Sequence, residues 1–154
     1  MKKTCPFVLG SVLTLIVCSA IAKASEKQIT YSDLPAAVQK TAQRESQGTV
    51  LRYSKEVENG KIEYEVEMIV AGKSKDISID PSGKVVEIEQ QLSLDAVPLA
   101  AMAAIQKGAA GGSVRKVEEV TSDTETAYEA QILNNGKRRE IRVHADGSAA
   151  PEQD

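Results

Sequence analysis

The sequence predicts an α+β fold: a tandem repeat of a helix followed by an antiparallel β-meander, with the helices packed on one face of the sheet. Residues 62–83 have a degenerate counterpart in residues 127–147, and matched positions such as Tyr64 and Tyr128 lie a constant 64 residues apart. Both stretches alternate apolar and polar side chains between glycine turns, which is typical of strands with one buried face. A short apolar stripe at helical spacing precedes each stretch.

Residues 1–24 have the features of a secretory signal peptide. Lys2 and Lys3 precede an apolar run over residues 7–21, and the segment ends in Ala22-Lys23-Ala24. This order of charge, apolar helix and small residues is what export and cleavage require. We expect cleavage between Ala24 and Ser25, which makes the product periplasmic or secreted and leaves no stable membrane insertion.

Two alternatives for this segment are disfavoured by the same residues. A permanent anchor needs roughly 20 apolar residues, and the run has about 15. A lipid attached to Cys18 requires small residues before it, but Val17 is β-branched. Because Cys5 and Cys18 are the only cysteines and both lie in the removed segment, the mature chain has no disulfides.

The charge of the mature chain opposes nucleic-acid binding. Residues 1–24 hold three of the 19 basic residues and none of the 22 acidic ones, so their removal leaves a net charge of −6. Binding to a phosphate backbone depends on lysine and arginine. Few aromatic residues remain, which also disfavours a platform for stacking bases or sugars.

The first predicted unit covers residues 25–91. After a polar lead, Pro35 begins a helix, since proline is tolerated in the first turn, and the helix ends near Gly48. Strands are predicted over residues 50–58, 61–70, 73–80 and 85–89. Asn59-Gly60, Ala71-Gly72 and Asp80-Pro81-Ser82-Gly83 supply the turns.

The second predicted unit covers residues 92–154 and repeats this plan. Asp95 and Pro98 begin its helix, which ends at the glycine-rich residues 108–112. Strands are predicted over residues 114–121, 125–133 and 137–144. The last strand is frayed or missing, since residues 148–154 do not alternate. That edge could accept an extended peptide, or the tail could simply cover it.

The residues give little support for an enzyme or a metal centre. The mature chain has no cysteine, and His144 is its only histidine, so neither a catalytic triad nor a zinc site can be assembled. The glycine-rich loop at 108–112 follows a helix, whereas a phosphate-binding loop precedes one. We expect no catalytic residues, no metal ligands and no cofactor.

An acidic sheet face is the remaining candidate site. Glu63, Glu65 and Glu67 point the same way from one strand, and Glu129 occupies the equivalent place in the second unit. These four are the predicted partner-binding residues. The alternative is an ordinary solvated face, in which neighbouring cations neutralise the carboxylates. The candidate cations are Lys73, Lys75, Lys137, Arg138 and Arg139.

The order of these motifs resembles the PepSY-like family, including members described as similar to β-lactamase-inhibitor proteins. The resemblance rests on the helix start at 32–38, the strand with Tyr64, Val66 and Met68, and the turns at Gly72-Lys73 and 80–83. It covers residues 30–89 and, in part, residues 95–147. It implies an exported, non-catalytic module that binds proteins or restrains peptidases, and it transfers no functional residue.

We therefore expect a non-enzymatic, exported module that binds a protein or peptide. Inhibition or regulation of an envelope or secreted peptidase is one role that such a module would have. The alternative is a sensor of a small ligand or divalent cation that uses the acidic face. A hydrolase using paired carboxylates is a third hypothesis, and no motif supports it.

Overall fold

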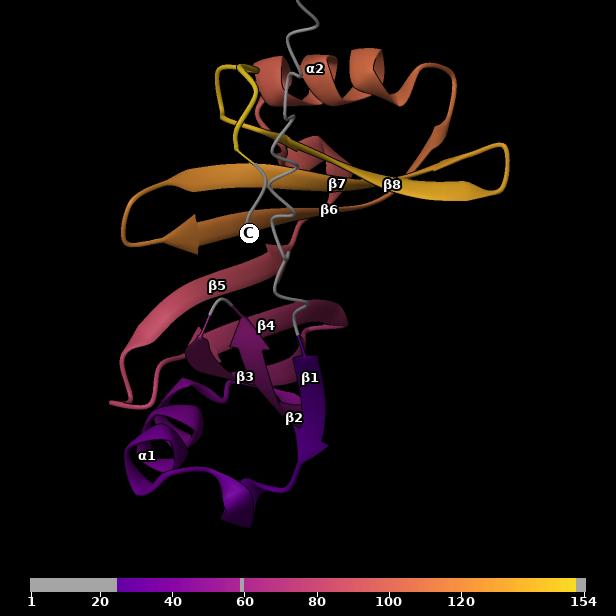
Figure 1. Ribbon diagram of the computed structural model, residues 1–154. Coiled ribbons are helices and arrows are strands. Elements are labelled where there is room, and N and C mark those ends of the chain that lie inside the picture. The colour runs from indigo at the N-terminus through magenta and orange to yellow at the C-terminus, as the bar shows by residue number, and fades with distance from the viewer. Residues whose placement is uncertain (1–24, 59, 152–154) are drawn as a thin grey trace, which may run out of the picture.

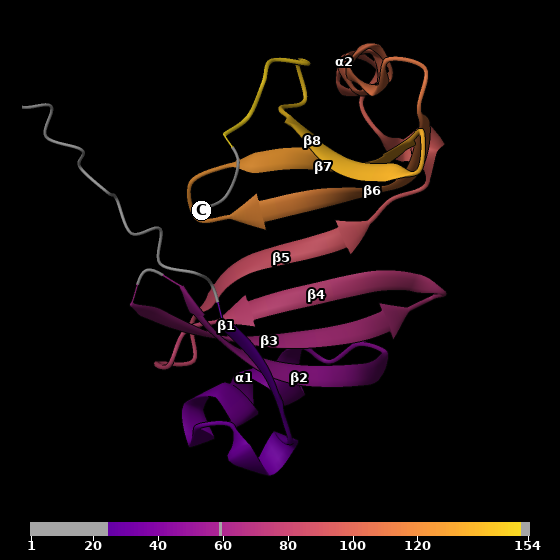
Figure 2. The same ribbon diagram turned by 45° about the vertical axis from the view of Figure 1, so that its right-hand side comes forward.

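The computed structural model describes residues 25–151 except residue 59, so the predicted signal peptide and Ala24 lie outside the described residues. Within this range the strands form one eight-stranded antiparallel sheet in chain order (Figures 1 and 2). The strands are β1 (Ser25–Ile29), β2 (Thr49–Glu58), β3 (Lys61–Val70), β4 (Lys73–Ile79), β5 (Val85–Gln91), β6 (Ser113–Ser122), β7 (Thr126–Asn134) and β8 (Lys137–Val143).

The predicted fold class, a tandem repeat of a helix and a meander, is wrong. Strands β5 and β6 pair with each other from Glu87↔Ser122 to Gln91↔Glu118, so the hydrogen bonds run on through one sheet. The described part of the chain also begins with β1, where a polar lead was expected. This strand lacks apolar alternation, and backbone pairing with β2 accounts for its formation.

Two α-helices, α1 (Ala36–Glu45) and α2 (Leu99–Ala109), occur in the described part of the chain. Each follows a 3₁₀ turn and a proline, Pro35 or Pro98, which precedes the first helical residue and therefore removes no helical hydrogen bond. Neither helix, nor any other in the described range, has the length and apolar character needed to cross a membrane.

The helices bury two separate hydrophobic clusters against the sheet. Helix α1 contributes Val38 and Ala42 to the first cluster, and α2 contributes Ala101 and Ile105 to the second. In Figures 1 and 2, α1 lies next to the first strands of the sheet, and α2 lies next to the last strands. The sheet side chains in the clusters are Tyr64, Val66, Met68, Ile77 and Ile79 for α1, and Val117, Tyr128, Ala130, Ile132 and Val143 for α2.

Both helices pack on the same face of the sheet. Paired residues point to one side, and the register links Val66 to Ile77 and Ile77 to Ile88 across β3, β4 and β5. The link continues from Ile88 to Thr121, which lies on the same side of β6 as Val117. The opposite side of the sheet, which we call the open face, is therefore free of helices.

Two turns fix the helices to the sheet. Thr41 of α1 donates a hydrogen bond from Oγ1 to the carbonyl of Gly83, at 2.6 Å. A Cβ added to Gly83, which has φ +89°, would lie 2.8 Å from the carbonyl oxygen of Ala37. At Gly147, with φ +83°, the same atom would lie 2.7 Å from the carbonyl oxygen of Ala100. Only glycine permits these close contacts.

We predict that Gly83→Ala destabilises the protein more than Gly72→Ala. Both glycines have positive φ, but Gly72 has no atom within 4 Å of an added Cβ. Gly72→Ala should cost about 1–2 kcal/mol for the backbone conformation. Gly83→Ala should cost about 2–4 kcal/mol, because the added methyl group also clashes with α1. Urea unfolding followed by circular dichroism measures both values, and equal losses would contradict the contact.

Candidate functional site

The open face carries most of the acidic side chains of the sheet. Its members follow from the pairing register, which places residues from all eight strands on the side away from the helices. Its acidic residues are Glu26, Glu56, Glu63, Glu65, Glu67, Asp76, Glu87, Glu89, Glu118, Glu129 and Glu140. Its basic residues include Arg52, Lys116, Arg138 and Arg142.

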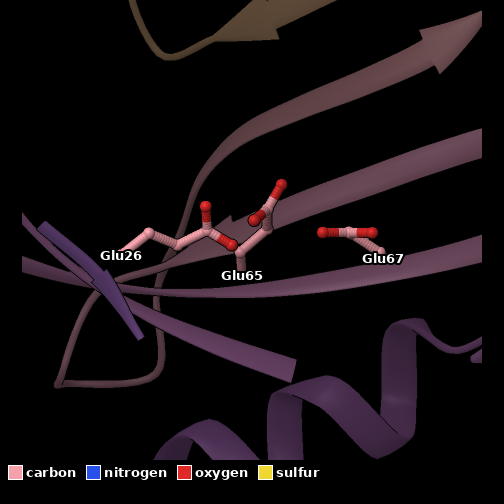
Figure 3. A group of neighbouring side chains, drawn as sticks. All are labelled: Glu26, Glu65 and Glu67. Atoms are coloured by element: carbon pink, nitrogen blue, oxygen red, sulfur yellow. The ribbon is translucent and has the colours of Figure 1, made fainter. Parts of the chain in front are cut away.

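The first group on this face consists of Glu26, Glu65 and Glu67 on β1 and β3. Each offers a carboxylate oxygen within 4.8 Å of the other two, and all three stand on the side of the sheet away from α1 (Figure 3). Arg52 forms ion pairs with Glu67 and, at 2.9 Å, with Glu26. Ser54 donates a hydrogen bond to Glu65 at 3.0 Å. One guanidinium and one hydroxyl of the protein therefore already contact the three carboxylates of this group.

Burial nevertheless raises the pKa of Glu65. The hydrogen bond from Ser54 lowers this pKa, while the neighbouring carboxylates of Glu56, Glu67 and Glu26 raise it. The guanidinium of Arg52 thus forms ion pairs with Glu26 and Glu67, whereas the carboxylate of Glu65 accepts a hydrogen bond from the hydroxyl of Ser54.

The second group consists of Asp76, Glu89 and Glu118, which lie on the adjacent strands β4, β5 and β6. Their carboxylate oxygens also lie within 4.8 Å of one another. Glu118 is 2% exposed, forms an ion pair with Lys116 at 2.7 Å and accepts a hydrogen bond from Ser74 Oγ at 3.1 Å. We call these three residues the central carboxyl group. It spans the pairing of β5 with β6, between the two hydrophobic clusters.

The central carboxyl group holds more negative charge than its surroundings neutralise. Burial, followed by the charges of Glu65, Glu118 and Glu67, raises the pKa of Asp76 to about 6, and Lys116 opposes this shift. Burial, followed by the charges of Glu118, Glu129, Glu87 and Asp76, raises the pKa of Glu89 to about 8. No described cation forms an ion pair with Asp76 or Glu89. At neutral pH, Glu89 is therefore largely protonated.

The third group lies at the far end of the face. Glu129 on β7 lies 3.9 Å from Arg142 on β8, whose side chain is 4% exposed and whose other ion pair, to Glu125, measures 3.1 Å. Burial and then Glu140 raise the pKa of Glu129, while Arg142 lowers it. His144, the only histidine, stands beyond β8 with Nδ1 4.0 Å from Glu125.

The four predicted partner-binding residues all lie on the open face but do not form one site. Glu63, Glu65 and Glu67 share β3, with Glu63 opposite Glu56 of β2. Glu129 lies four strands away on β7, which corresponds to about 19 Å at the usual strand spacing. The remaining site-residue predictions, the cleavage pair Ala24 and Ser25, concern processing, and of these only Ser25 is described, as the first residue of β1.

The sequence interpretation missed Asp76 and Glu118. A signal for Asp76 was present in the sequence. The turn at Gly72 closes a hairpin between β3 and β4, and this hairpin places Asp76 opposite Glu67 on the same face. No local signal identifies Glu118, which reaches the group only because β6 pairs with β5.

Most cations proposed to neutralise the acidic face lie on the other side of the sheet. Lys75 pairs with Met68 on the helix side, is 8% exposed, and donates to Gln47 at 3.3 Å. Arg139 donates to the carbonyl of Gly108 in α2. By the same alternation, Lys73 and Lys137 also face the helices, and only Arg138 lies on the open face.

We predict that Glu89→Gln stabilises the protein above neutral pH. The folded-state pKa of Glu89, about 8, exceeds its ordinary value of 4.5, so the folded protein binds the extra proton. The contribution of Glu89 to stability is fully present below about pH 4.5 and is lost as the pH rises from about 4.5 to about 8. Glutamine cannot ionise. The variant should therefore gain about 1 kcal/mol or more at about pH 8 and show a flatter pH dependence.

Urea unfolding at a series of pH values measures this effect. Glu63→Gln is the matched control, because it makes the same chemical change at the end of β3 on the same face. Equal stabilisation by both variants would show that total charge, and not the central carboxyl group, sets the pH dependence.

The sequence of this chain matches no protein-family model and no curated protein, but its fold resembles solved structures. A Bacteroides eggerthii protein described as periplasmic superposes with a TM-score of 0.63 and 18% identity, over 78% of this chain and 88% of that one. A DUF2874 family protein of Bacteroides ovatus gives 0.60 and 18%, over 77% and 85%.

A BLIP-like protein of Bacteroides fragilis gives a TM-score of 0.56 and 17% identity, over 77% of this chain and 85% of that one. At these identities the likeness concerns the fold, and the PepSY-like relationship and its two units stay predictions. The predicted periplasmic or secreted location agrees with the description of the B. eggerthii protein. The chain therefore shares its fold with these Bacteroides proteins, one of which is described as periplasmic and another as BLIP-like.

Proposed function

We propose that this chain is an exported, non-catalytic protein-binding module whose open face binds a basic segment of a partner protein. The observation that carries the proposal is the central carboxyl group. Asp76 and Glu89 are partly buried, lie beside Glu118, and have no described cationic partner.

A lysine or arginine side chain from a partner would supply the missing charge. Hydrogen bonds between a guanidinium and a carboxylate are stronger than those between neutral groups. Because Glu89 holds a proton near neutral pH, binding of a cationic side chain would release that proton. Affinity should therefore increase as the pH rises from about 6 to about 8.

The surrounding face supports the same partner chemistry. The mature chain has a net charge of −6, and the carboxylates of Glu65, Glu67, Glu87 and Glu129 flank the central group. A negative field of this kind accelerates the approach of a basic partner, whereas the half-buried carboxyls select where its cation binds.

The finer proposal is that the partner is an envelope or secreted peptidase, as the PepSY-like resemblance implies. Under this proposal the mature chain, residues 25–154, slows cleavage of a fluorescent casein substrate by a purified exported peptidase. The double variant Asp76→Asn/Glu89→Gln should slow it less. A panel of peptidases that is unaffected by the wild-type chain would contradict this partner class and leave basic-segment binding to its own test.

A divalent-cation sensor is the second candidate function. The observation in its favour is that both the first group and the central carboxyl group bring three carboxylate oxygens within 4.8 Å of one another. Calcium requires six to eight oxygen ligands, so water or further side chains would have to complete either site. Arg52 already occupies the first group, which leaves the central one as the better candidate.

We predict that the mature chain binds a ten-residue peptide with arginine at alternate positions. The double variant Asp76→Asn/Glu89→Gln should bind this peptide at least about tenfold more weakly, which corresponds to about 1.4 kcal/mol of binding free energy. Isothermal titration calorimetry at about pH 8, in buffers of different ionisation enthalpy, also counts the protons released.

The double variant Glu63→Gln/Glu140→Gln is the matched control, because it removes the same formal charge from the two ends of the face. Equal weakening by both double variants would show that only the overall charge attracts the peptide and would overturn the assignment of a site. Calcium chloride forms a separate arm, and saturable calcium binding without peptide binding would favour the sensor.

A further inference from the structure

The last strand, β8, has a free edge that carries the opposite charge to the open face. Strand β8 ends the sheet, and β7 is the one described strand that pairs with it. On its outer side, the described backbone contacts begin at Arg142, whose carbonyl accepts a hydrogen bond from Ala150 at 3.1 Å. The bridge from Val143 to Ala149 lies next to it. From Lys137 to Ile141 no described residue pairs with this edge.

The backbone groups of this free edge can be assigned to residues. Alternate residues of an antiparallel strand direct their N–H and C=O groups to the same side. Because the carbonyl of Arg142 points outward to Ala150, the backbone groups of Glu140 and Arg138 also point outward. Among residues 25–151, therefore, nothing pairs with two donors and two acceptors of this edge, which stand in the alternating order that a peptide strand matches.

Three consecutive cations line the same edge. Lys137, Arg138 and Arg139 are all exposed, and no described residue forms an ion pair with them, while Arg139 also donates a hydrogen bond to the carbonyl of Gly108. By strand alternation, Arg138 lies on the open face, while Lys137 and Arg139 lie on the helix side. A hollow lined by Arg138, Arg139, Glu140 and Gln131 lies beside them.

We propose that the free edge of β8 binds an extended acidic peptide segment of a partner protein by strand addition. The backbone of the segment would pair with Arg138 and Glu140, and its acidic side chains would lie opposite Lys137, Arg138 and Arg139. Opposite-charge pairs across neighbouring strands are stabilising, and main-chain pairing provides the affinity in this mode of recognition.

The same residues disfavour other occupants. Two copies of β8 would bring their cations together, which opposes pairing between identical edges. Strand β1, at the other end of the described sheet, offers no free acidic strand to β8, because its Glu26 already binds Arg52 and lies next to Lys27. A nucleic acid would gain from the cations, but its phosphates cannot match the alternating donors and acceptors, and the net charge of −6 expected for residues 25–154 repels it.

The test uses the mature chain and the blocked peptide Ser-Val-Thr-Glu-Glu-Glu-Thr-Ser. Binding is measured by calorimetry, and hydrogen exchange is followed by NMR at the amides of Arg138 and Glu140. We expect both amides to exchange at least about tenfold more slowly in the complex, since strand addition buries them in hydrogen bonds. A peptide with the same charges but N-methylated at alternate backbone positions should bind at least about tenfold more weakly.

Two protein variants separate the contributions of charge and backbone. Glu140→Pro removes an outward N–H and leaves the pairing with β7 intact, so it should weaken binding although it makes the edge more basic. Lys137→Gln/Arg138→Gln leaves the backbone unchanged and should weaken binding by at least about tenfold. Asp76→Asn/Glu89→Gln should leave the affinity for this peptide unchanged, so this proposal and the proposed function can fail separately.

Several outcomes would overturn the proposal. Equal affinity for the N-methylated peptide, or unprotected amides at Arg138 and Glu140, would show charge attraction without strand addition. Tighter binding of single-stranded DNA than of the peptide would show that the edge is a polyanion site. Concentration-dependent dimers that protect the same amides without peptide would show that a second copy occupies the edge.

Discussion

The pairing of β5 with β6 is the constraint on which the rest of the structure depends. It joins strands that pack on α1 to strands that pack on α2, and it does so through residues Glu87–Gln91 and Glu118–Ser122. Neither hydrophobic cluster extends across it. The hydrogen bonds of this pairing therefore determine that the protein has one sheet with one helix-free face, and they bring the central carboxyl group together.

The sequence predicts the local elements well because each depends on nearby residues. Alternation over residues 61–70 and 73–79 corresponds to β3 and β4, and the glycines at 72, 83, 136 and 147 occupy turns with positive φ. The fold class was not predicted correctly, because the eight strands form one meander and not a tandem repeat of a helix and a meander. Whether β5 pairs with β6, or each meander ends separately, depends on hydrogen bonds between polar strands, and apolar periodicity gives no information about these.

The same limit explains what was found and missed in the candidate site. Alternation along one strand is enough to place Glu63, Glu65 and Glu67 on one face, and it also places Glu129 correctly on that face. It does not show that Asp76, Glu89 and Glu118 meet, because these residues come from the three strands β4, β5 and β6. Glu118 reaches the other two only because β6 pairs with β5. The same alternation places Lys75 on the side of Ile77 and Arg139 on the side of Ile141, so it already argues against a pairing of these two cations with the acidic face.

The position of the central carboxyl group has a mechanical consequence for the molecule. Its members belong to strands on both sides of the boundary between the two hydrophobic clusters, so repulsion among ionised carboxylates acts to separate one half of the body from the other. In acidic surroundings the protons bound by Asp76 and Glu89 relieve this repulsion. In alkaline surroundings the repulsion opposes the hydrogen bonds between β5 and β6, and a cation delivered by another molecule would reduce it.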